Sequence, residues 1–411
     1  MKTNGGMKIV FGALALGALT LVAGCGGGAS SASTPAQTIT NSGSNVVPIS
    51  VNLGPTNDYP DAAFITVTVC APGSTTNCQA IENVLVDTGS TGLRILGSAL
   101  GSVTLNQTTV NGNPLAECYQ YLDGSFNWGP VMTADVQIGG ETASSLPVHV
   151  LDDAFSVIPS ATCSGTPVDT LSGLGANGIL GIGPVQYDCG SSCTGNIPAF
   201  DQYYQCSTST PSSCSVVGAP DNLQVQNPIS FFATDNNGVI VELPAVTSPQ
   251  ATLSGSLVFG IGTQSNNALG SATVVEMDPS SLSFTTNFED TNMADSFIDS
   301  GSNGLYFDSN SSSLPECSDT DFYCPSTTAS LSAVNSASSG SSASVHFNVG
   351  NADVLFNSND AALPGLGAPN DGTFTSFDWG LPFFFGRNVY TSIEGATTPG
   401  GTAPYFAFPQ N

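Results

Sequence analysis

Basic residues are scarce in this sequence. Its 411 residues include 4 Lys and Arg against 31 Asp and Glu, which gives a formal net charge of −27. Nucleic acids and anionic lipid surfaces are bound through clusters of Lys and Arg, so a chain this acidic would be repelled by both. We therefore expect no nucleic-acid partner.

Histidine is nearly absent as well. The two histidines, His149 and His346, lie far apart in the sequence, and each is flanked by apolar residues. A zinc site needs His or a dense group of Cys thiolates, and a Ser-His-Asp or Cys-His hydrolase needs a His together with a recognisable nucleophile motif. Neither histidine meets these conditions. We expect both to be structural, and we expect no metal site.

Long stretches with helical periodicity are also missing. The chain instead contains short runs of alternating or β-branched residues at 64–69, 131–138, 239–243 and 255–261, separated by Gly, Asn, Pro and Ser. The Ser- and Ala-rich stretch 326–344 has no apolar stripe, and we expect it to be an exposed loop. With 22 Phe and 10 Tyr to supply a core, the sequence predicts a folded, all-β protein.

The N-terminus has the layout of an export signal. Lys2 and Lys8 precede a short apolar stretch that ends just before Cys25 and is too short to span a bilayer. The ending Leu-Val-Ala-Gly-Cys resembles the lipobox of bacterial lipoproteins, whose cysteine becomes the acylated first residue. We expect a lipoprotein signal peptide at 1–24, then a lipid-anchored Cys25 and a flexible linker at 25–46. A cleaved secretory peptide without a lipid is the alternative.

The remaining cysteines predict disulfides. Setting Cys25 aside from the 11 cysteines leaves ten, and eight of these form close pairs along the sequence. An exported chain meets an oxidising compartment, where such pairs close short loops as disulfides. The predicted pairs are Cys70 with Cys78, Cys189 with Cys193, Cys206 with Cys214, Cys317 with Cys324, and, by elimination, Cys118 with Cys163.

One motif occurs twice. Residues 85–93 read LVDTGSTGL and residues 297–305 read FIDSGSNGL, so five of nine positions are identical. In each copy, two large apolar residues precede the aspartate and a glycine follows two residues later. This pattern is typical of a strand that ends in a tight turn and delivers a carboxylate to a buried place.

Two such strands suggest a reaction. If the two halves of the chain pack about a pseudo-two-fold axis, Asp87 and Asp299 face each other. Two carboxyl groups at hydrogen-bond distance do not both ionise readily, so they would share one proton. The ionised group could then act as a general base on a water molecule, while the protonated group donates to a carbonyl oxygen.

These motifs resemble those of the bilobal, pepsin-like aspartic proteases, and the resemblance covers most of residues 47–411. Together with the lipobox, it suggests a bacterial lipoprotein branch of that family. Four further segments support the resemblance. Tyr121–Ser125 is similar to the tip of the family's flap, and Asn177–Gly183 to the segment behind the first catalytic loop. Gly255–Gly260 is similar to the strand that opens the second lobe, and Arg387–Glu394 to the closing strand.

The resemblance implies an all-β, two-lobed fold with an active-site cleft between an N-terminal lobe at 47–247 and a C-terminal lobe at 248–411. It implies no cofactor. It assigns catalysis to two aspartates, support of their carboxyl groups to four hydroxyls, and the flap to one tyrosine: Asp87 and Asp299; Thr88, Ser90, Ser300 and Ser302; Tyr121. Without the resemblance, the four hydroxyls would be expected only to satisfy the backbone of turns.

The sequence departs from the family pattern in three places. Arg94 stands where many relatives carry a large aromatic residue, which leaves the hydrogen-bond partner of the flap tyrosine open. The stretch 377–385 gives no clean match to the apolar-apolar-Gly segment of the second lobe, and Pro382 stands where an acidic residue is usual. Residues 26–86 contain no Lys or Arg, so we expect no basic propiece that plugs the cleft.

The sequence therefore predicts an aspartic endopeptidase at the bacterial cell envelope, attached to the membrane through Cys25 and acting as a monomer on extended polypeptides. The alternative is a non-catalytic surface lipoprotein of the same fold that binds peptides or a protein partner. The acidity allows two interpretations. It would favour activity and stability at acid pH, or it would serve only to keep a cation-poor protein soluble.

Overall fold

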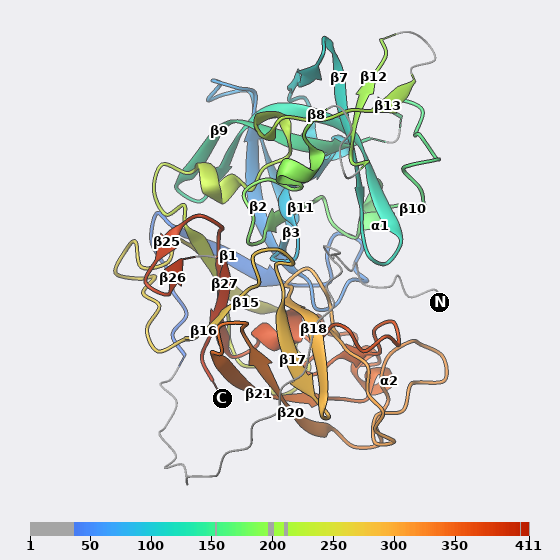
Figure 1. Ribbon diagram of the computed structural model, residues 1–411, viewed down its shortest axis with the longest axis vertical. Coiled ribbons are helices and arrows are strands. Elements are labelled where there is room, and N and C mark those ends of the chain that lie inside the picture. The colour runs from blue at the N-terminus through green and yellow to red at the C-terminus, as the bar shows by residue number, and fades with distance from the viewer. Residues whose placement is uncertain (1–36, 153, 196–200, 209–212, 403, 411) are drawn as a thin grey trace.

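The structure is a computed structural model that describes residues 37–152, 154–195, 201–208, 213–402 and 404–410. The predicted signal peptide and Cys25 lie outside the described residues. The chain forms two lobes built almost wholly from β-strands, one above the other in Figure 1. The predicted all-β, two-lobed fold is confirmed.

The first lobe is drawn in blue to green in Figure 1. Its core is formed mainly by Val, Ile and Leu side chains, and β4 and β11 are buried along their whole length. Its elements are β2 (Ala63–Cys70), β3 (Cys78–Asp87), β4 (Thr91–Leu96), β5 (Asn106–Gln107), β6 (Thr109–Val110), β7 (Asn113–Gln120), β8 (Ser125–Ile138), β9 (Glu141–Leu151), β10 (Thr166–Pro167), the one-turn helix α1 (Leu171–Leu174), β11 (Gly178–Ile182), β12 (Tyr203–Cys206) and β13 (Cys214–Val216).

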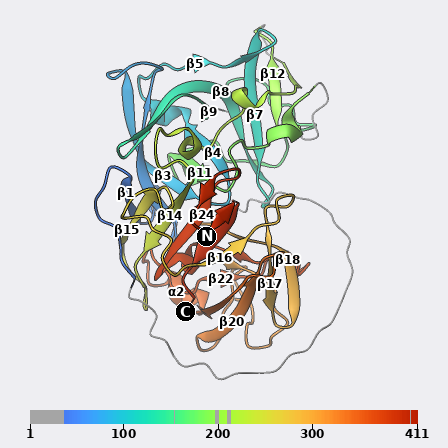
Figure 2. The ribbon, with the colours of Figure 1, turned by 60° about the vertical axis from the view of Figure 1, so that its left-hand side comes forward.

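A set of antiparallel strands joins the lobes. They pair in the order β1–β15–β14–β24–β27–β16, and β1 also pairs with β2 of the first lobe. Figure 2 shows β14 and β24 between the lobes. The strands are β1 (Val46–Val51), β14 (Gly238–Leu243), β15 (Leu253–Phe259), β16 (Thr273–Glu276), β24 (Arg387–Ser392) and β27 (Tyr405–Phe408).

The chain is already packed against this sheet before β1. The Thr40 backbone N–H donates to Glu242 Oε2 at 2.6 Å, and the Asn45 side-chain amide donates to the Phe259 carbonyl at 2.9 Å. Asn45 is fully buried. Packing therefore begins within the segment for which the sequence predicts a flexible linker.

The second lobe contains a seven-stranded sheet with the order β21-β20-β17-β18-β23-β19-β22. Its core is aromatic: the rings of Phe307 and Trp379 stack on either face of Phe377, with centroids 4.6 and 3.9 Å away. Its elements, with a separate hairpin near the C-terminus, are β17 (Phe284–Phe288), β18 (Thr291–Ile298), β19 (Leu305–Tyr306), β20 (Ala329–Ser336), β21 (Ser342–Val349), α2 (Ala352–Phe356), β22 (Gly367–Ala368), β23 (Asp378–Trp379), β25 (Thr397–Thr398) and β26 (Gly401–Thr402).

The prediction of an exposed loop at 326–344 is wrong. Most of this stretch belongs to the β20–β21 hairpin, which pairs along its full length. Ala333 and Ala343 are buried whereas Ser332 and Ser344 are exposed, so small residues alternate with the period of a strand. Ser and Ala have low strand propensity, but packing against a neighbouring sheet decides the conformation.

All five predicted disulfides are confirmed. Cys70 faces Cys78 across β2 and β3, and Cys206 faces Cys214 across β12 and β13, so these bonds close hairpins. Five disulfides indicate an oxidising compartment. Within the described part of the chain, no helix has the length and apolar character needed to cross a membrane.

Candidate active site

The two repeated motifs meet between the lobes. Asp87 ends β3, and Asp299 directly follows β18. Both aspartates are fully buried. The Gly89 N–H donates to Oδ1 of Asp87 at 2.8 Å and to Oδ1 of Asp299 at 3.1 Å, so the two carboxyl groups lie beside the same amide. One aspartate from each half of the chain therefore enters a single site.

The hydroxyls next to the aspartates form a symmetric cross-link. The Thr88 Oγ1 hydroxyl donates to the Ile298 carbonyl at 3.0 Å and accepts from the Ser300 N–H at 2.9 Å. In the opposite direction, the Ser300 Oγ hydroxyl donates to the Val86 carbonyl at 2.7 Å and accepts from the Thr88 N–H at 3.1 Å. Each loop thus holds the strand end of the other lobe and fixes the separation of the aspartates.

The two serines of the motifs orient the carboxyl groups. Ser90 Oγ donates to Asp87 Oδ2 at 2.6 Å, and Ser302 Oγ donates to Asp299 Oδ2 at 2.8 Å. Both serines are buried. Because these bonds engage Oδ2, the Oδ1 oxygens are left for the backbone amides and for the opposite carboxyl group.

Glycine is required between the motif residues because the two loops approach closely. A Cβ atom on Gly89 would lie 2.5 Å from Asp299 Cγ, and one on Gly301 would lie 2.7 Å from Asp87 Cγ. Real Cβ atoms do not tolerate such contacts, so any other residue would push the aspartates apart.

Each loop is supported from behind by a further strand. In the first lobe, β11 pairs in parallel with β3 and antiparallel with β4, and Gly181 lies opposite Asp87. In the second lobe, β23 pairs in the same manner with β18 and β19. The stretch 377–385 gave no clean match in sequence. Its residues Asp378, Trp379 and Gly380 nevertheless lie behind the Asp299 loop, as β11 lies behind the Asp87 loop.

This support brings a third carboxyl group to the site. Asp378 is buried, and its Oδ2 lies 2.7 Å from Ser302 Oγ, within hydrogen-bond distance. The same hydroxyl bonds to Asp299. Asp378 is not part of a recognisable motif in the sequence. The only available signal was an acidic residue just before a Trp-Gly pair in a segment that matched poorly.

Burial and like charge govern the acidity of the pair. Burial raises the pKa of Asp299 well above its usual range, and the charges of Asp87 and Asp378 raise it further. Burial also raises the pKa of Asp87, although hydrogen bonds from Asp299, Ser90 and Gly89 oppose that rise. The pair therefore retains a proton at a pH where an ordinary aspartate has lost it.

Tyr121 lies at the tip of the β7–β8 hairpin, which projects toward the second lobe (Figure 1). Its hydroxyl donates to Asn127 Oδ1, and the Asn127 amide donates to Asp169 Oδ1 at 3.1 Å. Burial raises the pKa of Tyr121, although the charge of Arg94 opposes that rise. Asn127 is thus the hydrogen-bond partner that the sequence left open.

A second tyrosine lies near the dyad. Tyr59 donates from its hydroxyl to the Gly301 carbonyl at 3.5 Å. Burial raises its pKa, and Asp299 and Asp87 contribute through their charges. No sequence signal identifies Tyr59, because it precedes the first motif in an irregular segment.

Arg94 forms a buried charge cluster in the first lobe. Its Nη2 contacts Glu117 Oε1 at 3.0 Å and Asp188 Oδ2 at 3.3 Å, and its guanidinium lies 3.5 Å from the centre of the Tyr119 ring. His149 Nδ1 lies 2.9 Å from Glu117 Oε2, so the first histidine is structural. Burial alone would raise the pKa of Glu117, but the charge of Arg94 helps to hold it well below its usual range.

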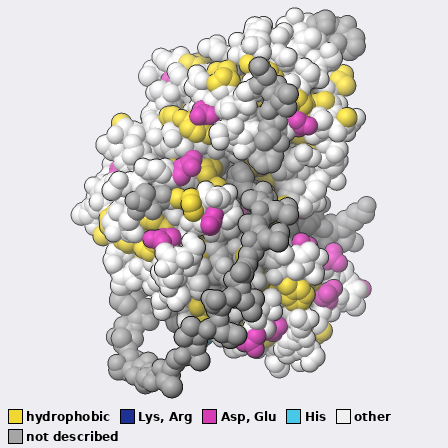
Figure 3. Space-filling view, viewed as in Figure 1, with side chains coloured by type: hydrophobic (Ala, Val, Ile, Leu, Met, Phe, Trp, Pro, Cys, Tyr) yellow, Lys and Arg dark blue, Asp and Glu magenta, His cyan; other side chains and the backbone are white. Residues whose placement is uncertain are grey.

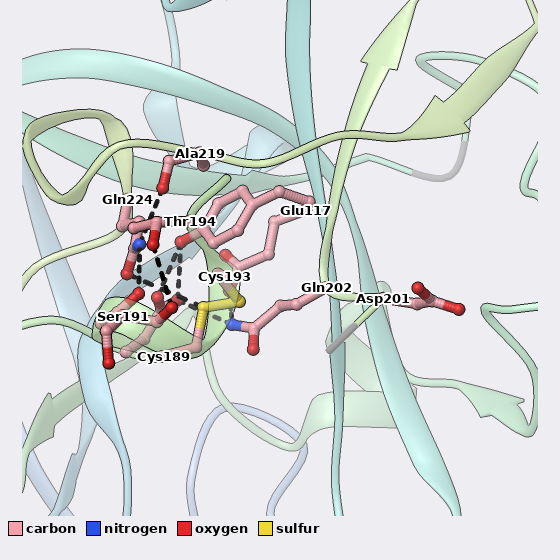
Figure 4. Close-up of a disulfide and its surroundings, with 12 residues drawn as sticks. Glu117, Cys189, Ser191, Cys193, Thr194, Asp201, Gln202, Ala219 and Gln224 are labelled. Atoms are coloured by element: carbon pink, nitrogen blue, oxygen red, sulfur yellow. Dashed lines mark hydrogen bonds between the residues drawn. A yellow bond between two sulfur atoms is a disulfide. The ribbon is translucent and has the colours of Figure 1, made fainter. Parts of the chain in front are cut away.

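Gln202 also bonds to the two carboxylates of the cluster. Gln202 Nε2 donates to Glu117 Oε1 at 2.8 Å and to Asp188 Oδ2 at 2.9 Å, and Figure 4 shows its side chain beside the Cys189–Cys193 disulfide. Burial raises the pKa of Asp188 well above its usual range, and the charge of Glu117 adds to this.

Within the described ranges, one group of residues has the spacing for a metal ion: Cys317, Cys324 and Asp353. The two cysteines form a disulfide, so their sulfurs are not available as thiolate ligands. Asp87 and Asp299 are therefore a stronger candidate for a functional site than this group of three residues.

The fold defines the structural class: a two-lobed, pepsin-like architecture with one aspartate from each lobe at the centre. The crystal structure of an aspartic proteinase from Irpex lacteus is similar, with a TM-score of 0.50, 16% sequence identity, and coverage of 89% of this chain and 97% of the other. The chain itself belongs to the family described as "Protein of unknown function (DUF3443)", whose model matches residues 41–408. No curated protein matches the sequence.

Proposed function

We propose that the protein is an aspartic endopeptidase that hydrolyses peptide bonds through a water molecule activated by Asp87 and Asp299. The observation that carries this proposal is that the two buried carboxyl groups accept hydrogen bonds from the same Gly89 N–H. Two carboxyl groups in this position hold one proton between them, so one serves as a base and the other as an acid.

The reaction follows from this shared proton. The ionised carboxylate takes a proton from water, whose oxygen bonds to the carbonyl carbon of the peptide, while the other carboxyl donates its proton to the carbonyl oxygen. When the tetrahedral intermediate collapses, the C–N bond breaks and the nitrogen takes a proton from the carboxyl that acted as base. The other carboxyl recovers its proton from a hydroxyl of the intermediate, which restores the dyad.

We propose an extended polypeptide as substrate, bound as a strand beneath the β7–β8 hairpin. An extended chain offers backbone hydrogen bonds along a cleft, and side pockets set the preference for particular residues. Because both aspartates are fully buried, a substrate reaches them only after the segments that cover the dyad move aside.

We also propose that the protein is exported, is anchored to the bacterial cell envelope through a lipid on Cys25, and acts as a monomer. The five disulfides support export. The expected result is a mature chain that begins at acylated Cys25, measured by mass spectrometry of its N-terminal peptide. A mature N-terminus elsewhere would contradict the anchor.

A second candidate function is a non-catalytic surface lipoprotein that binds a peptide or a protein partner. The complete burial of both carboxyl groups favours it, because a dyad that never opens cannot bind a peptide bond. The presence of both aspartates and all four supporting hydroxyls favours the enzyme.

Cleavage of a denatured protein separates these two functions. We expect the purified chain to cleave it, pepstatin to inhibit the cleavage, and Asp87→Asn and Asp299→Asn each to abolish it. Asp321→Asn, at an exposed aspartate of the second lobe, is the matched control and should retain full activity. Absence of cleavage by the folded wild-type chain, or full activity in either dyad variant, would contradict the enzyme.

A further inference from the structure

The second lobe contains a cavity of about 650 Å³ that includes neither dyad aspartate in its wall. It lies between the end of β21, helix α2, the beginning of β24 and the loop at residues 246–249. This volume is within the range of about 300–1,000 Å³ that is usual for small-molecule sites. Much of its wall is apolar, with contributions from Val354, Leu355, Pro364, Pro382, Phe383 and Phe385.

Arg387 is the only Lys or Arg among the lining residues, which also include His346. It is nearly fully buried, and its guanidinium lies 4.6 Å from the centre of the Phe383 ring. Its Nη1 donates to the Phe383 carbonyl at 2.5 Å, and its Nη2 donates to the His346 carbonyl at 3.1 Å. Nε has no hydrogen-bond partner among the described residues.

The charge of Arg387 has no counter-charge in the described part of the chain. All ion pairs there involve Arg94 or His149, and no carboxylate oxygen lies within 4.0 Å of Arg387. The two carbonyl contacts are neutral. Burial of an unpaired charge is costly, and proteins normally avoid it by pairing the charge.

Comparison with Arg94 makes the difference clear. Arg94 is equally buried, but Glu117 and Asp188 contact it and raise its pKa. For Arg387, burial lowers the pKa of the guanidinium to about 10. In a chain with 31 Asp and Glu, the one buried arginine without a carboxylate partner lines the large cavity.

We propose that this cavity binds a small organic monocarboxylate with an apolar body, whose carboxylate pairs with Arg387. One buried positive charge calls for one negative charge, and the planar guanidinium matches a carboxylate. The apolar wall accommodates a hydrocarbon body, while exposed Ser326, Thr327 and Thr328 line the rim. The net charge of −27 opposes multiply charged anions such as phosphate.

Isothermal titration calorimetry with hexanoate tests this site. We expect saturable binding of hexanoate by the wild-type chain. Hexanamide, which has the same shape without the charge, and inorganic phosphate should each bind at least about tenfold more weakly. Equal affinity for hexanamide would overturn the proposal, because the charge of Arg387 would then have no part in recognition. Tighter binding of phosphate would overturn the choice of an apolar carboxylate.

Two variants assign the binding to this cavity. Arg387→Met should abolish hexanoate binding, but the loss of a buried side chain could also unfold the lobe. Val354→Glu avoids this difficulty, since Val354 lines the cavity and is 67% exposed. The added negative charge at the rim should weaken hexanoate binding by about fivefold. Val334→Glu, at an exposed valine that does not line the cavity, is the matched control and should leave affinity unchanged. Unchanged affinity in Val354→Glu would overturn the proposal.

Discussion

Ser302 has one hydroxyl proton but bonds to two carboxyl groups, those of Asp299 and Asp378, at 2.8 and 2.7 Å. A single proton cannot be donated to both oxygens at once. The Ser302 hydroxyl therefore couples Asp378 to Asp299. Asp378 thus belongs to the same hydrogen-bond network as the dyad. In the first lobe, the equivalent hydroxyl of Ser90 bonds to Asp87.

Replacement of Asp378 should shift the pH dependence of cleavage. The charge of Asp378 raises the pKa of Asp299, so Asp378→Asn should lower that pKa. The alkaline limb of the kcat/KM profile is then expected to move to lower pH by about 0.5–1 unit, while the asparagine amide still pairs with Ser302. The profile of Asp321→Asn, an exposed aspartate, should match that of the wild type. An unchanged alkaline limb in Asp378→Asn would show that Asp378 does not influence the dyad.

Individual residues differ in how far the sequence could predict them. Asp87 and Asp299 could be identified because their motif occurs twice with its apolar flanks and glycines. Asp378 and Asn127 could not, because their roles depend on tertiary contacts. Asp378 reaches Ser302 only because β23 pairs with β18, and Asn127 reaches Tyr121 across the β7–β8 turn.

At the scale of elements, the Arg94 cluster links four parts of the first lobe. Arg94 is on β4, Glu117 on β7 and His149 on β9, and Asp188 precedes the Cys189–Cys193 loop. All four side chains are buried. A buried charge left without its partner is more costly than the pair itself, so removal of Arg94 should affect all of these elements.

Arg94→Met should destabilise the protein in a pH-dependent manner. At pH 7 we expect a loss of about 3–5 kcal/mol, because Glu117 and Asp188 are left buried without a cation. Arg94 helps to hold the pKa of folded Glu117 below its unfolded value, so their pairing stabilises the protein above about pH 4 and is lost as the pH falls through the folded pKa. The loss in Arg94→Met should therefore be smaller at low pH. Denaturant unfolding with disulfides intact, at pH 2 and pH 7, measures both values.

Arg387→Met is the matched control for this prediction. Arg387 is buried without a carboxylate partner in the described ranges, so its replacement should cost a similar free energy at both pH values. An equal pH dependence in the two variants would contradict the role assigned to Glu117 and Asp188.

Elements were predicted best where their residues were large. The runs at 64–69, 131–138, 239–243 and 255–261 all lie in strands or overlap them. The part of the β20–β21 hairpin within 326–344 was missed because its buried strand residues are Ala333, Asn335 and Ala343, which give no apolar stripe. Close pairing of the cysteines along the sequence was sufficient to predict the disulfides.

At the scale of the whole molecule, negative charge dominates the surface. Asp and Glu side chains are scattered over the face shown in Figure 3, whereas Arg94 and Arg387 are buried. The four basic residues cannot offset 31 acidic ones. Mutual repulsion therefore opposes the folded state at neutral pH, and protonation relieves it.

The protein should be more stable at pH 4 than at pH 7. Burial raises the pKa of Asp61, Asp188 and Asp299. The folded state then binds protons that the unfolded chain has released, so the free energy of unfolding falls as the pH rises above about 4 toward the folded pKa values. Glu117, whose pKa is lowered, makes the opposite contribution to the free energy of unfolding, but it is one group against three. Thermal unfolding in low salt should give a higher Tm at pH 4.

Salt provides the control for this interpretation. Added NaCl screens repulsion between exposed charges, so it should raise the Tm at pH 7 and have a smaller effect at pH 4. A higher Tm at pH 7 than at pH 4 in low salt would mean that the acidic surface serves solubility without affecting stability.

The pH dependence of kcat/KM for one defined peptide tests most directly whether Asp87 and Asp299 form a catalytic pair. We predict a bell-shaped profile whose alkaline limb lies above the usual carboxyl range, and a fall of at least about 1,000-fold in both Asp87→Asn and Asp299→Asn. A profile that is the same in wild type and in Asp299→Asn, or a folded wild-type protein that cleaves the peptide at no pH, would contradict the account.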